Sequence, residues 1–258
     1  MQMLRRSLAY LLVLAACCAA PLMARAEEVN VAVAANFLGT LQKLAPMYQQ
    51  VSGDQLLPSA GSSGQLYTQI KQGAPFDVLL SADSDHPARL ETEGLAAPGS
   101  HFTYAIGTLV LWSPKAGVVD NAGKLLSSDR YRTISIANPA AAPYGAAAQQ
   151  VLMALGLWDR LNSAKKIVIG ENIDQAWQFT ATGAADVGFV ALSEVTRDGS
   201  ISGSYWLPPQ SMYKPIDQDA VVLKRSSKGA SAQKFLDWLR HDPQAIAVIK
   251  AAGYRISR

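Results

Sequence analysis

Short apolar runs alternate with segments of helical spacing along most of the chain. Residues 29–34 are apolar at all but one position and predict a buried strand. The apolar positions between Leu38 and Tyr48 then mark one face of a helix that ends near Gly53. Further strands are predicted at residues 56–59, 76–80, 133–137, 167–169, 187–190 and 219–223. Further helices, the first with its turn, are predicted at residues 61–70, 87–93, 146–155, 173–182, 232–240 and 243–252. This alternation predicts an α/β fold with mainly parallel sheets.

No polar linker divides the chain, so two lobes would have to share strands that cross between them. The apolar stretch at residues 102–112 is the candidate for the outgoing strand, and residues 212–223 are the candidate for the returning strand. In open α/β sheets, ligands bind at the C-terminal ends of strands. We therefore expect a ligand site between the two lobes.

The first 26 residues have the pattern of a secretory leader. Arg5 and Arg6 precede an apolar run at residues 8–20, and an A-x-A pattern ends at Ala26. The run is short for a membrane span. Cleavage after Ala26 would leave a mature chain whose first strand begins almost at once. In an alternative interpretation, the LAAC sequence that ends at Cys17 is a bacterial lipobox, and Cys17 carries a lipid anchor. Both interpretations predict export.

Removing the leader changes the charge balance. The chain of 258 residues has 23 lysine and arginine residues and 20 aspartate and glutamate residues. The leader contains three of the arginines and no acidic residue, so 20 basic residues remain beside 20 acidic ones. A neutral mature chain gives no indication of nucleic-acid or membrane-surface binding. Both cysteines also lie in the leader, so a chain cleaved after Ala26 has no disulfide, cysteine nucleophile or cysteine metal site.

Small polar residues stand at four places where a predicted helix begins. These are Ala35-Asn36, Ser62-Ser63, Pro143-Tyr144-Gly145 and Glu171-Asn172-Ile173. No lysine or arginine lies in residues 61–70, so an anion there would be held by helix N–H groups and hydroxyls. Ser62 and Gln65 have capping-box spacing, which would leave the hydroxyl and N–H of Ser63 facing outward. In the alternative interpretation, Asn36, Ser62 and Ser63 are helix caps and nothing more.

Enzyme motifs are weak in this sequence. The histidines lack metal-site spacing and are expected to be surface or hydrogen-bonded residues: His86, His101 and His241. The Gly61–Gly64 segment is close to a G-x-S-x-G nucleophile elbow, but Gln65 replaces the last glycine. The S-x-x-K match at residues 163–166 lacks its partner motifs, and Asp77 and Asp83 are expected to have structural roles. No P-loop or G-x-G-x-x-G sequence occurs.

The segment from Gly61 to Asp83 closely resembles periplasmic molybdate-binding proteins of ABC importers, the ModA family. The matching residues are Gly61-Ser62-Ser63-Gly64-Gln65-Leu66, Gln69-Ile70, Gly73-Ala74-Pro75, Asp77 and Ser81-Ala82-Asp83, with weaker matches at Ala34-Ala35-Asn36, Val187-Gly188-Phe189-Val190 and Gly253-Tyr254-Arg255-Ile256. The resemblance implies a type II periplasmic binding protein with two Rossmann-like lobes joined by a two-strand hinge. With a leader at residues 1–26, it implies a first lobe at 27–106 and 219–258 and a second lobe at 107–218.

The resemblance also implies which residues bind the ligand. The positions carried over are Asn36, Ser63, Tyr144 and Ile173. Asn36 stands where many members use a serine, Ser63 would bind through its hydroxyl and N–H, and Ile173 would offer its N–H. Ala82 would line the pocket floor. Many members have a tyrosine where this chain has Ala191, and we expect the phenol of Tyr144 to replace it.

The family implies a binding protein and not an enzyme. It would capture molybdate, or tungstate, in the periplasm and deliver it as a monomer to a membrane permease with a cytoplasmic ATPase. It would need no cofactor, and its metal would be only the molybdenum of the bound oxyanion. Two alternatives stay open. One is a binding protein for another oxyanion such as sulfate, or for a small organic acid. The other is an exported hydrolase that uses Ser63 as its nucleophile.

Overall fold

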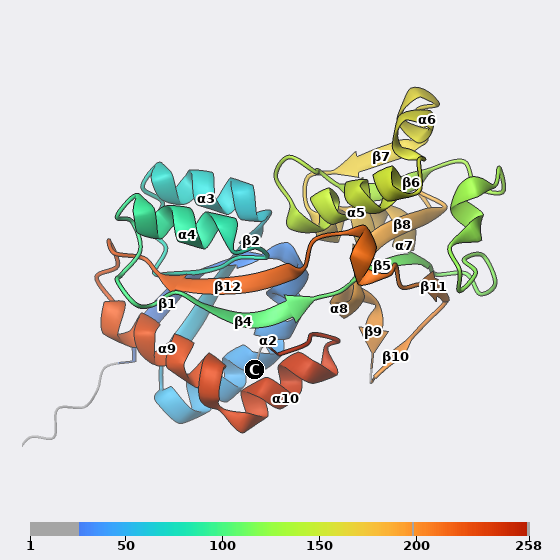
Figure 1. The fold of residues 1–258 in the computed structure, drawn as a ribbon. Helices are drawn as coiled ribbons and strands as arrows, with labels where there is room; N and C mark the ends of the chain where they lie inside the picture. Colours follow the sequence, from blue (N-terminus) through green and yellow to red (C-terminus); the bar gives the residue numbers. More distant parts are fainter. Residues whose placement is uncertain (1–25, 198, 257–258) are drawn as a thin grey trace, which may run out of the picture.

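The computed structural model describes residues 26–197 and 199–256. The predicted leader, including Cys17, therefore lies outside the described residues apart from Ala26. The described chain forms two lobes, each built on a sheet with helices on both faces (Figure 1). Within these residues, no helix is long and apolar enough to cross a membrane.

The first lobe is built on a sheet of strand order β2-β1-β3-β12-β4. Its strands are β1 (Glu28–Ala34), β2 (Gln55–Gly61), β3 (Val78–Leu80), β4 (Phe102–Gly107) and β12 (Ile216–Val222). Its helices are α2 (Ala35–Ser52), α3 (Ser63–Lys71), α4 (Asp85–Thr92), α9 (Gly229–His241) and α10 (Pro243–Ala251). As predicted, α2 ends at Gly53, which adopts the left-handed conformation at the helix C-terminus.

The second lobe is built on a sheet of strand order β11-β5-β8-β6-β7. Its strands are β5 (Leu109–Ser113), β6 (Ile134–Ala137), β7 (Ile167–Gly170), β8 (Val187–Ala191) and β11 (Ser204–Trp206), with a separate hairpin of β9 (Thr196–Arg197) and β10 (Ser200–Ile201). Its helices are α5 (Pro143–Ala154), α6 (Trp158–Ser163), α7 (Ile173–Ala181), α8 (Leu192–Val195) and the short 3-10 turns η1 (Lys124–Ser127) and η2 (Gln210–Met212).

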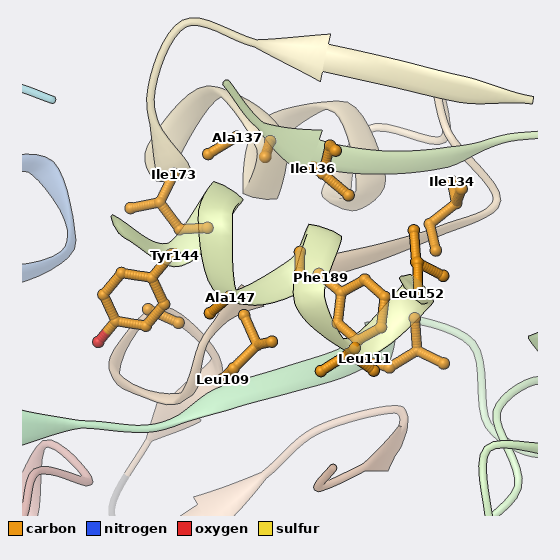
Figure 2. Packing of buried hydrophobic residues seen from close by; sticks show 14 of the residues in the cluster. Leu109, Leu111, Ile134, Ile136, Ala137, Tyr144, Ala147, Leu152, Ile173 and Phe189 are labelled. Atoms are coloured by element: carbon orange, nitrogen blue, oxygen red, sulfur yellow. The ribbon is translucent and has the colours of Figure 1, made fainter. Parts of the chain in front are cut away.

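The two faces of each sheet pack against different helices. In β1, Val29, Val31 and Val33 belong to the core formed with α2, α9 and α10, whereas Ala32 belongs to the core formed with α3 and α4. This alternation follows from the two-residue period of a strand. In the second lobe, Figure 2 shows a core in which residues of β5, β6 and β8 pack against α5.

The prediction of mainly parallel sheets is correct for only part of each sheet. Strands β1, β2 and β3 are parallel, as are β6, β7 and β8. The strands next to the crossings, however, pair antiparallel: β12 with β3 and β4, and β5 with β8 and β11. The chain leaves the first lobe along β4 and returns along the neighbouring β12, so these two strands run in opposite directions.

The lobes are joined where β4 passes into β5 and where the chain returns into β12 (Figure 1). The apolar stretch expected to form one outgoing strand is divided into β4 and β5, one in each sheet. The returning strand begins at Ile216, which pairs with Gly107. Residues 216–218, which were expected to belong to the second lobe, therefore pair with β4 in the first sheet.

A partly buried ion-pair group connects α4, β12 and the loop before β4 in the first lobe. The imidazole of His101 contacts Glu91 of α4 and Asp219 of β12, with both N–O distances 2.7 Å. Burial alone would lower the pKa of the imidazole, but hydrogen bonds to the two carboxylates outweigh it, and the pKa lies above its ordinary value. The charged imidazole therefore stabilises the folded state. This contribution is fully present below the pKa of the unfolded state, about 6.5, and is lost as the pH rises through the raised pKa of the folded state.

We expect His101→Gln to lower the free energy of unfolding at pH 6 by about 1.5–3 kcal/mol, because charged hydrogen bonds are lost. The difference between parent and variant should shrink from pH 6 to pH 9, because the imidazole loses its charge as the pH rises through the raised pKa. Urea denaturation at both pH values measures it. His241→Gln is the matched control, because Nδ1 of His241 bonds the backbone carbonyl of Asp237. An equal difference at both pH values would contradict the charged group.

Candidate functional site

A small cavity lies where the two lobes meet. It is lined by Ala34, Ala35, Asn36, Gly61, Ser62, Ser63, Ala82, Ala142, Pro143, Tyr144, Asn172 and Ile173. Apart from Ala82, which follows β3, these residues lie at or just before the starts of α2, α3, α5 and α7, the four helix N-termini singled out in the sequence. The space left for a water-sized probe is about 10 Å³, roughly what one water molecule needs. The walls of the cavity therefore lie close together in this structure.

The start of α3 has the predicted capping box. The Ser62 hydroxyl accepts a hydrogen bond from the N–H of Gln65 at 3.4 Å, and the Gln65 side chain accepts one from the N–H of Ser62 at 3.1 Å. Ser63 is fully buried, and its hydroxyl oxygen accepts the N–H of Ala82 at 2.9 Å. The hydroxyl hydrogen of Ser63 is therefore free to be donated, and α3 leaves the N–H groups of its first turn without intrahelical partners.

The start of α5 brings a phenol to the cavity. Pro143 is the first residue of the helix, and Gly145 lets it approach β6, since a Cβ on Gly145 would collide with the carbonyl of Ala137. In Figure 2 the hydroxyl of Tyr144 points away from the aliphatic core. Its oxygen accepts a hydrogen bond from Nε2 of Gln218 at 3.1 Å. Burial raises the pKa of the Tyr144 phenol well above its ordinary value, so the group stays neutral.

The starts of α7 and α2 supply backbone donors. Asn172 caps α7 by accepting the N–H of Gln175 at 3.0 Å, and Ile173 is the first helical residue, with its N–H in the unpaired first turn. Asn36 lies in the first turn of α2, but its side chain is engaged within the protein. Nδ2 donates to Oε1 of Gln218 at 2.9 Å and to the hydroxyl of Tyr254 at 3.0 Å. Its backbone N–H, rather than the expected amide group, is thus the available donor.

Hydrogen bonds between the lobes hold this cavity closed. The N–H of Gly64 in α3 donates to the carbonyl of Ala141, just before α5, at 3.0 Å. On another side, the hydroxyl of Ser193 in α8 donates to the backbone carbonyl of Asn36 at 3.1 Å. The structure is therefore a closed form in which both lobes contribute lining residues.

The lining carries no aspartate, glutamate, lysine, arginine or histidine in the described part of the chain. Positive potential comes instead from the N-terminal ends of four helices. Neutral donors at helix ends bind anions without a countercharge. The chemistry offered here is anion binding.

The residues considered for catalysis are not brought together. His86 contacts Asp83, and Asp77 accepts hydrogen bonds from the N–H of Asn30 and the hydroxyl of Ser226. No group of acidic, histidine or cysteine side chains with metal-binding geometry occurs in residues 26–197 and 199–256. The structural roles expected for these two aspartates are confirmed.

Two residues of this region were missed by sequence reasoning. Gln218 and Tyr254 are buried and hydrogen-bonded to lining residues without lining the cavity themselves. Gln218 lies among the polar residues at positions 217–219 of an otherwise apolar strand, and that signal could have identified it. Ala191 is buried outside the lining, whereas Ala82 lines the cavity as expected.

This chain is similar to bacterial binding proteins along most of its length. The family model of bacterial extracellular solute-binding proteins matches residues 29–255. The molybdate-binding protein ModA of Azotobacter vinelandii is 49% identical over 232 residues, which are 90% of this chain and 91% of the relative. ModA of Rhodobacter capsulatus is 47% identical over 233 residues, 90% of each chain.

A solved structure confirms the expected fold. The periplasmic molybdate-binding protein of Azotobacter vinelandii superimposes with a TM-score of 0.88 at 48% identity. The match covers 89% of this chain and all of that chain. The expected two-lobed binding-protein architecture is thereby confirmed.

We expect Ser62→Ala to lower the free energy of unfolding by about 0.5–2 kcal/mol, because α3 loses its cap. Thermal or urea unfolding measures the loss. Ser227→Ala, at an exposed serine, is the control and should change stability little. Equal stabilities of the two variants would contradict the capping role.

Proposed function

Because this chain belongs to the ModA family of bacterial extracellular solute-binding proteins, we propose that it captures molybdate outside the cytoplasm for an ABC importer. The observation that carries the proposal is the convergence of α2, α3, α5 and α7 on one small cavity with uncharged walls. The names and sequence identities of the relatives point to the same ligand.

The donors around the cavity match a tetrahedral dianion. They are the hydroxyl and N–H of Ser63, the phenol of Tyr144 and the backbone N–H groups of Asn36 and Ile173. Hydrogen bonds to charged groups contribute roughly 1.5–3 kcal/mol each, so five contribute on the order of 8–15 kcal/mol before the costs of closure and immobilisation. Micromolar or tighter affinity, about −8.2 kcal/mol or below, is within this range.

Selectivity follows from the donor set and the cavity size. A fully ionised oxyanion needs only donors, whereas protonated phosphate also needs an acceptor. Tungstate has the same charge and shape as molybdate and would bind as well. Sulfate also matches in charge and shape but is smaller, so its exclusion must depend on how closely the walls approach.

A hydrolase is the weaker alternative. A nucleophilic serine needs a base within hydrogen-bond reach. The hydroxyl oxygen of Ser63 is instead bonded to the N–H of Ala82, and the relatives named above are molybdate-binding proteins. Ser63 thus acts as a ligand donor in this proposal.

The proposed setting follows from the leader and the relatives. Export through residues 1–26 places the protein in the periplasm, either free or anchored through Cys17. There it acts as a monomer and passes molybdate to a membrane permease driven by a cytoplasmic ATPase. The neutral charge of the mature chain and the periplasmic relative support this setting.

We expect calorimetry and thermal shift to detect molybdate and tungstate binding to the purified mature chain, with no stabilisation by sulfate or phosphate. At a ligand concentration 100 times Kd, the stabilisation is about 2.7 kcal/mol. Stabilisation by sulfate alone would favour the other oxyanion, and ester hydrolysis that depends on Ser63 would favour the enzyme.

Ser63→Ala is expected to weaken molybdate binding roughly 10- to 150-fold, since one hydrogen bond to a charged ligand is lost. Ser62→Ala is the matched control, because the Ser62 hydroxyl also donates to Oε1 of Gln65 at 2.9 Å. That control should lose stability but keep its affinity. The same affinity loss in both variants would argue against a direct contact from Ser63.

Ile173→Pro tests a backbone donor. Proline is tolerated at the first position of a helix, and Asn172 has the extended conformation that precedes proline, so the change removes the N–H while α7 is kept. We expect molybdate affinity to fall roughly 10-fold or more by calorimetry. Ile173→Val keeps the N–H and should bind as the parent does. Equal affinities of the two variants would exclude this N–H as a ligand.

A further inference from the structure

A buried chain of hydrogen bonds leads from the backbone of Asn36 to the phenol of Tyr144. The hydroxyl of Tyr254 lies 2.7 Å from the carbonyl oxygen of Asn36 and 3.0 Å from its Nδ2. The same Nδ2 lies 2.9 Å from Oε1 of Gln218, and Nε2 of Gln218 lies 3.1 Å from the Tyr144 hydroxyl. The chain connects α10's C-terminal segment, α2, β12 and α5, and so reaches from the first lobe into the second.

The donor and acceptor of each hydrogen bond in this row follow from the end at Tyr254. The hydroxyl of Tyr254 has two acceptors within reach, the carbonyl of Asn36 at 2.7 Å and Oγ of Ser193 at 2.9 Å, and Ser193 donates its own hydrogen to that carbonyl. The single hydroxyl hydrogen of Tyr254 is therefore donated to one of these two acceptors. The Tyr254 oxygen must then accept from the Asn36 side chain, which places Nδ2, and not Oδ1, toward it. The second hydrogen of Nδ2 therefore points at Gln218, whose facing atom must be the acceptor Oε1.

The same reasoning determines the Tyr144 proton. With Oε1 facing Asn36, the NH₂ group of Gln218 faces Tyr144 and donates to its oxygen. The hydroxyl of Tyr104 lies 3.1 Å from Oε1 and 3.3 Å from the carbonyl oxygen of Ser81, so its hydrogen has an acceptor on either side and is compatible with this orientation. The Tyr144 oxygen thus accepts from inside the protein, and its own hydrogen is left for the cavity.

Close packing holds Gln218 in this position. It is completely buried, and it lies at an irregularity of β12, between Gln218 and Asp219, where the pairing with β4 shifts register. Gly107 of β4 leaves the necessary space, because a Cβ there would collide with the Tyr144 hydroxyl and with Nε2 of Gln218. An amide confined in this way does not rotate freely to reverse its donor and acceptor.

We propose that Gln218 is a positioning residue for anion binding: it keeps the Tyr144 hydroxyl as a donor toward the cavity, in an orientation set by Tyr254 through Asn36. The inference rests on the proposed molybdate function but adds residues that do not touch the ligand. It also makes the donor set depend on closure, since Gln218 pairs within the first sheet and Tyr144 belongs to the second lobe.

A double-mutant cycle with molybdate calorimetry tests the proposal. The variants are Gln218→Met, Tyr144→Phe and the two together, each first checked for a cooperative thermal transition. Tyr144→Phe should weaken binding roughly 10- to 150-fold. Gln218→Met should weaken binding at least 5-fold in the parent but less than 2-fold in the Tyr144→Phe background, because its effect acts through the phenol.

Tyr254, at the other end of the row of hydrogen bonds, supplies a second variant if Gln218→Met fails to fold. Tyr254→Phe removes one hydroxyl outside the cavity lining and frees the Asn36 amide to reverse. It should lose affinity in the parent and little in the Tyr144→Phe background. Gln218→Glu should weaken binding more than Gln218→Met does, because a carboxylate would accept the Tyr144 proton.

The outcomes separate the two proposals. A parent that binds molybdate, with equal losses from Gln218→Met and from Tyr254→Phe in both backgrounds, would overturn the positioning role and leave the proposed function intact. A parent that binds no molybdate would overturn both. Losses of molybdate affinity that disappear in the Tyr144→Phe background would support the positioning role of Gln218.

Discussion

A helix leaves the N–H groups of its first turn without partners, and the whole binding site depends on this constraint. In this protein α2, α3, α5 and α7 each begin at the same cavity. Two of these helices belong to each lobe, so neither lobe alone can surround an ion with donors. The sheets serve this arrangement, because the loop after a strand delivers the following helix to the edge where the lobes meet.

The strands that cross between the lobes allow the lobes to open and close. Only β4 with its continuation β5, and the return into β12, carry the chain between the sheets in the described residues. The closed form is held by a few contacts, among them the bond from Gly64 to Ala141. A bound dianion would add hydrogen bonds to both sides and shift the population toward this form. The donor direction of Tyr144, set through Gln218, belongs to the same closed state.

Local features of the site could be predicted from the sequence because they depend on neighbours in the chain. The capping box of Ser62 and Gln65 is an example, since both partners lie within one helical turn. The use of the Asn36 amide was beyond sequence reasoning, because its partners Gln218 and Tyr254 lie 182 and 218 positions away. The antiparallel pairing of β12 was missed for a similar reason: a strand pattern does not reveal which strand lies beside it.

Convergence of the helix starts could be suspected, but only the tertiary structure brings residues 36, 63, 144 and 173 to one cavity. The family resemblance predicts these four positions as ligand-binding residues. It does not predict Gln218 and Tyr254, because these two residues hydrogen-bond to lining residues and do not line the cavity themselves.

The absence of charged side chains from the described cavity lining has a consequence for the protein as a whole. A mature chain with equal numbers of acidic and basic residues would gain two negative charges on loading, with no proton or cation taken up to balance them. Empty and loaded molecules would then migrate differently in an electric field and elute separately from an anion exchanger. A bound dianion thus changes the net charge of the molecule, even when it is buried between the lobes.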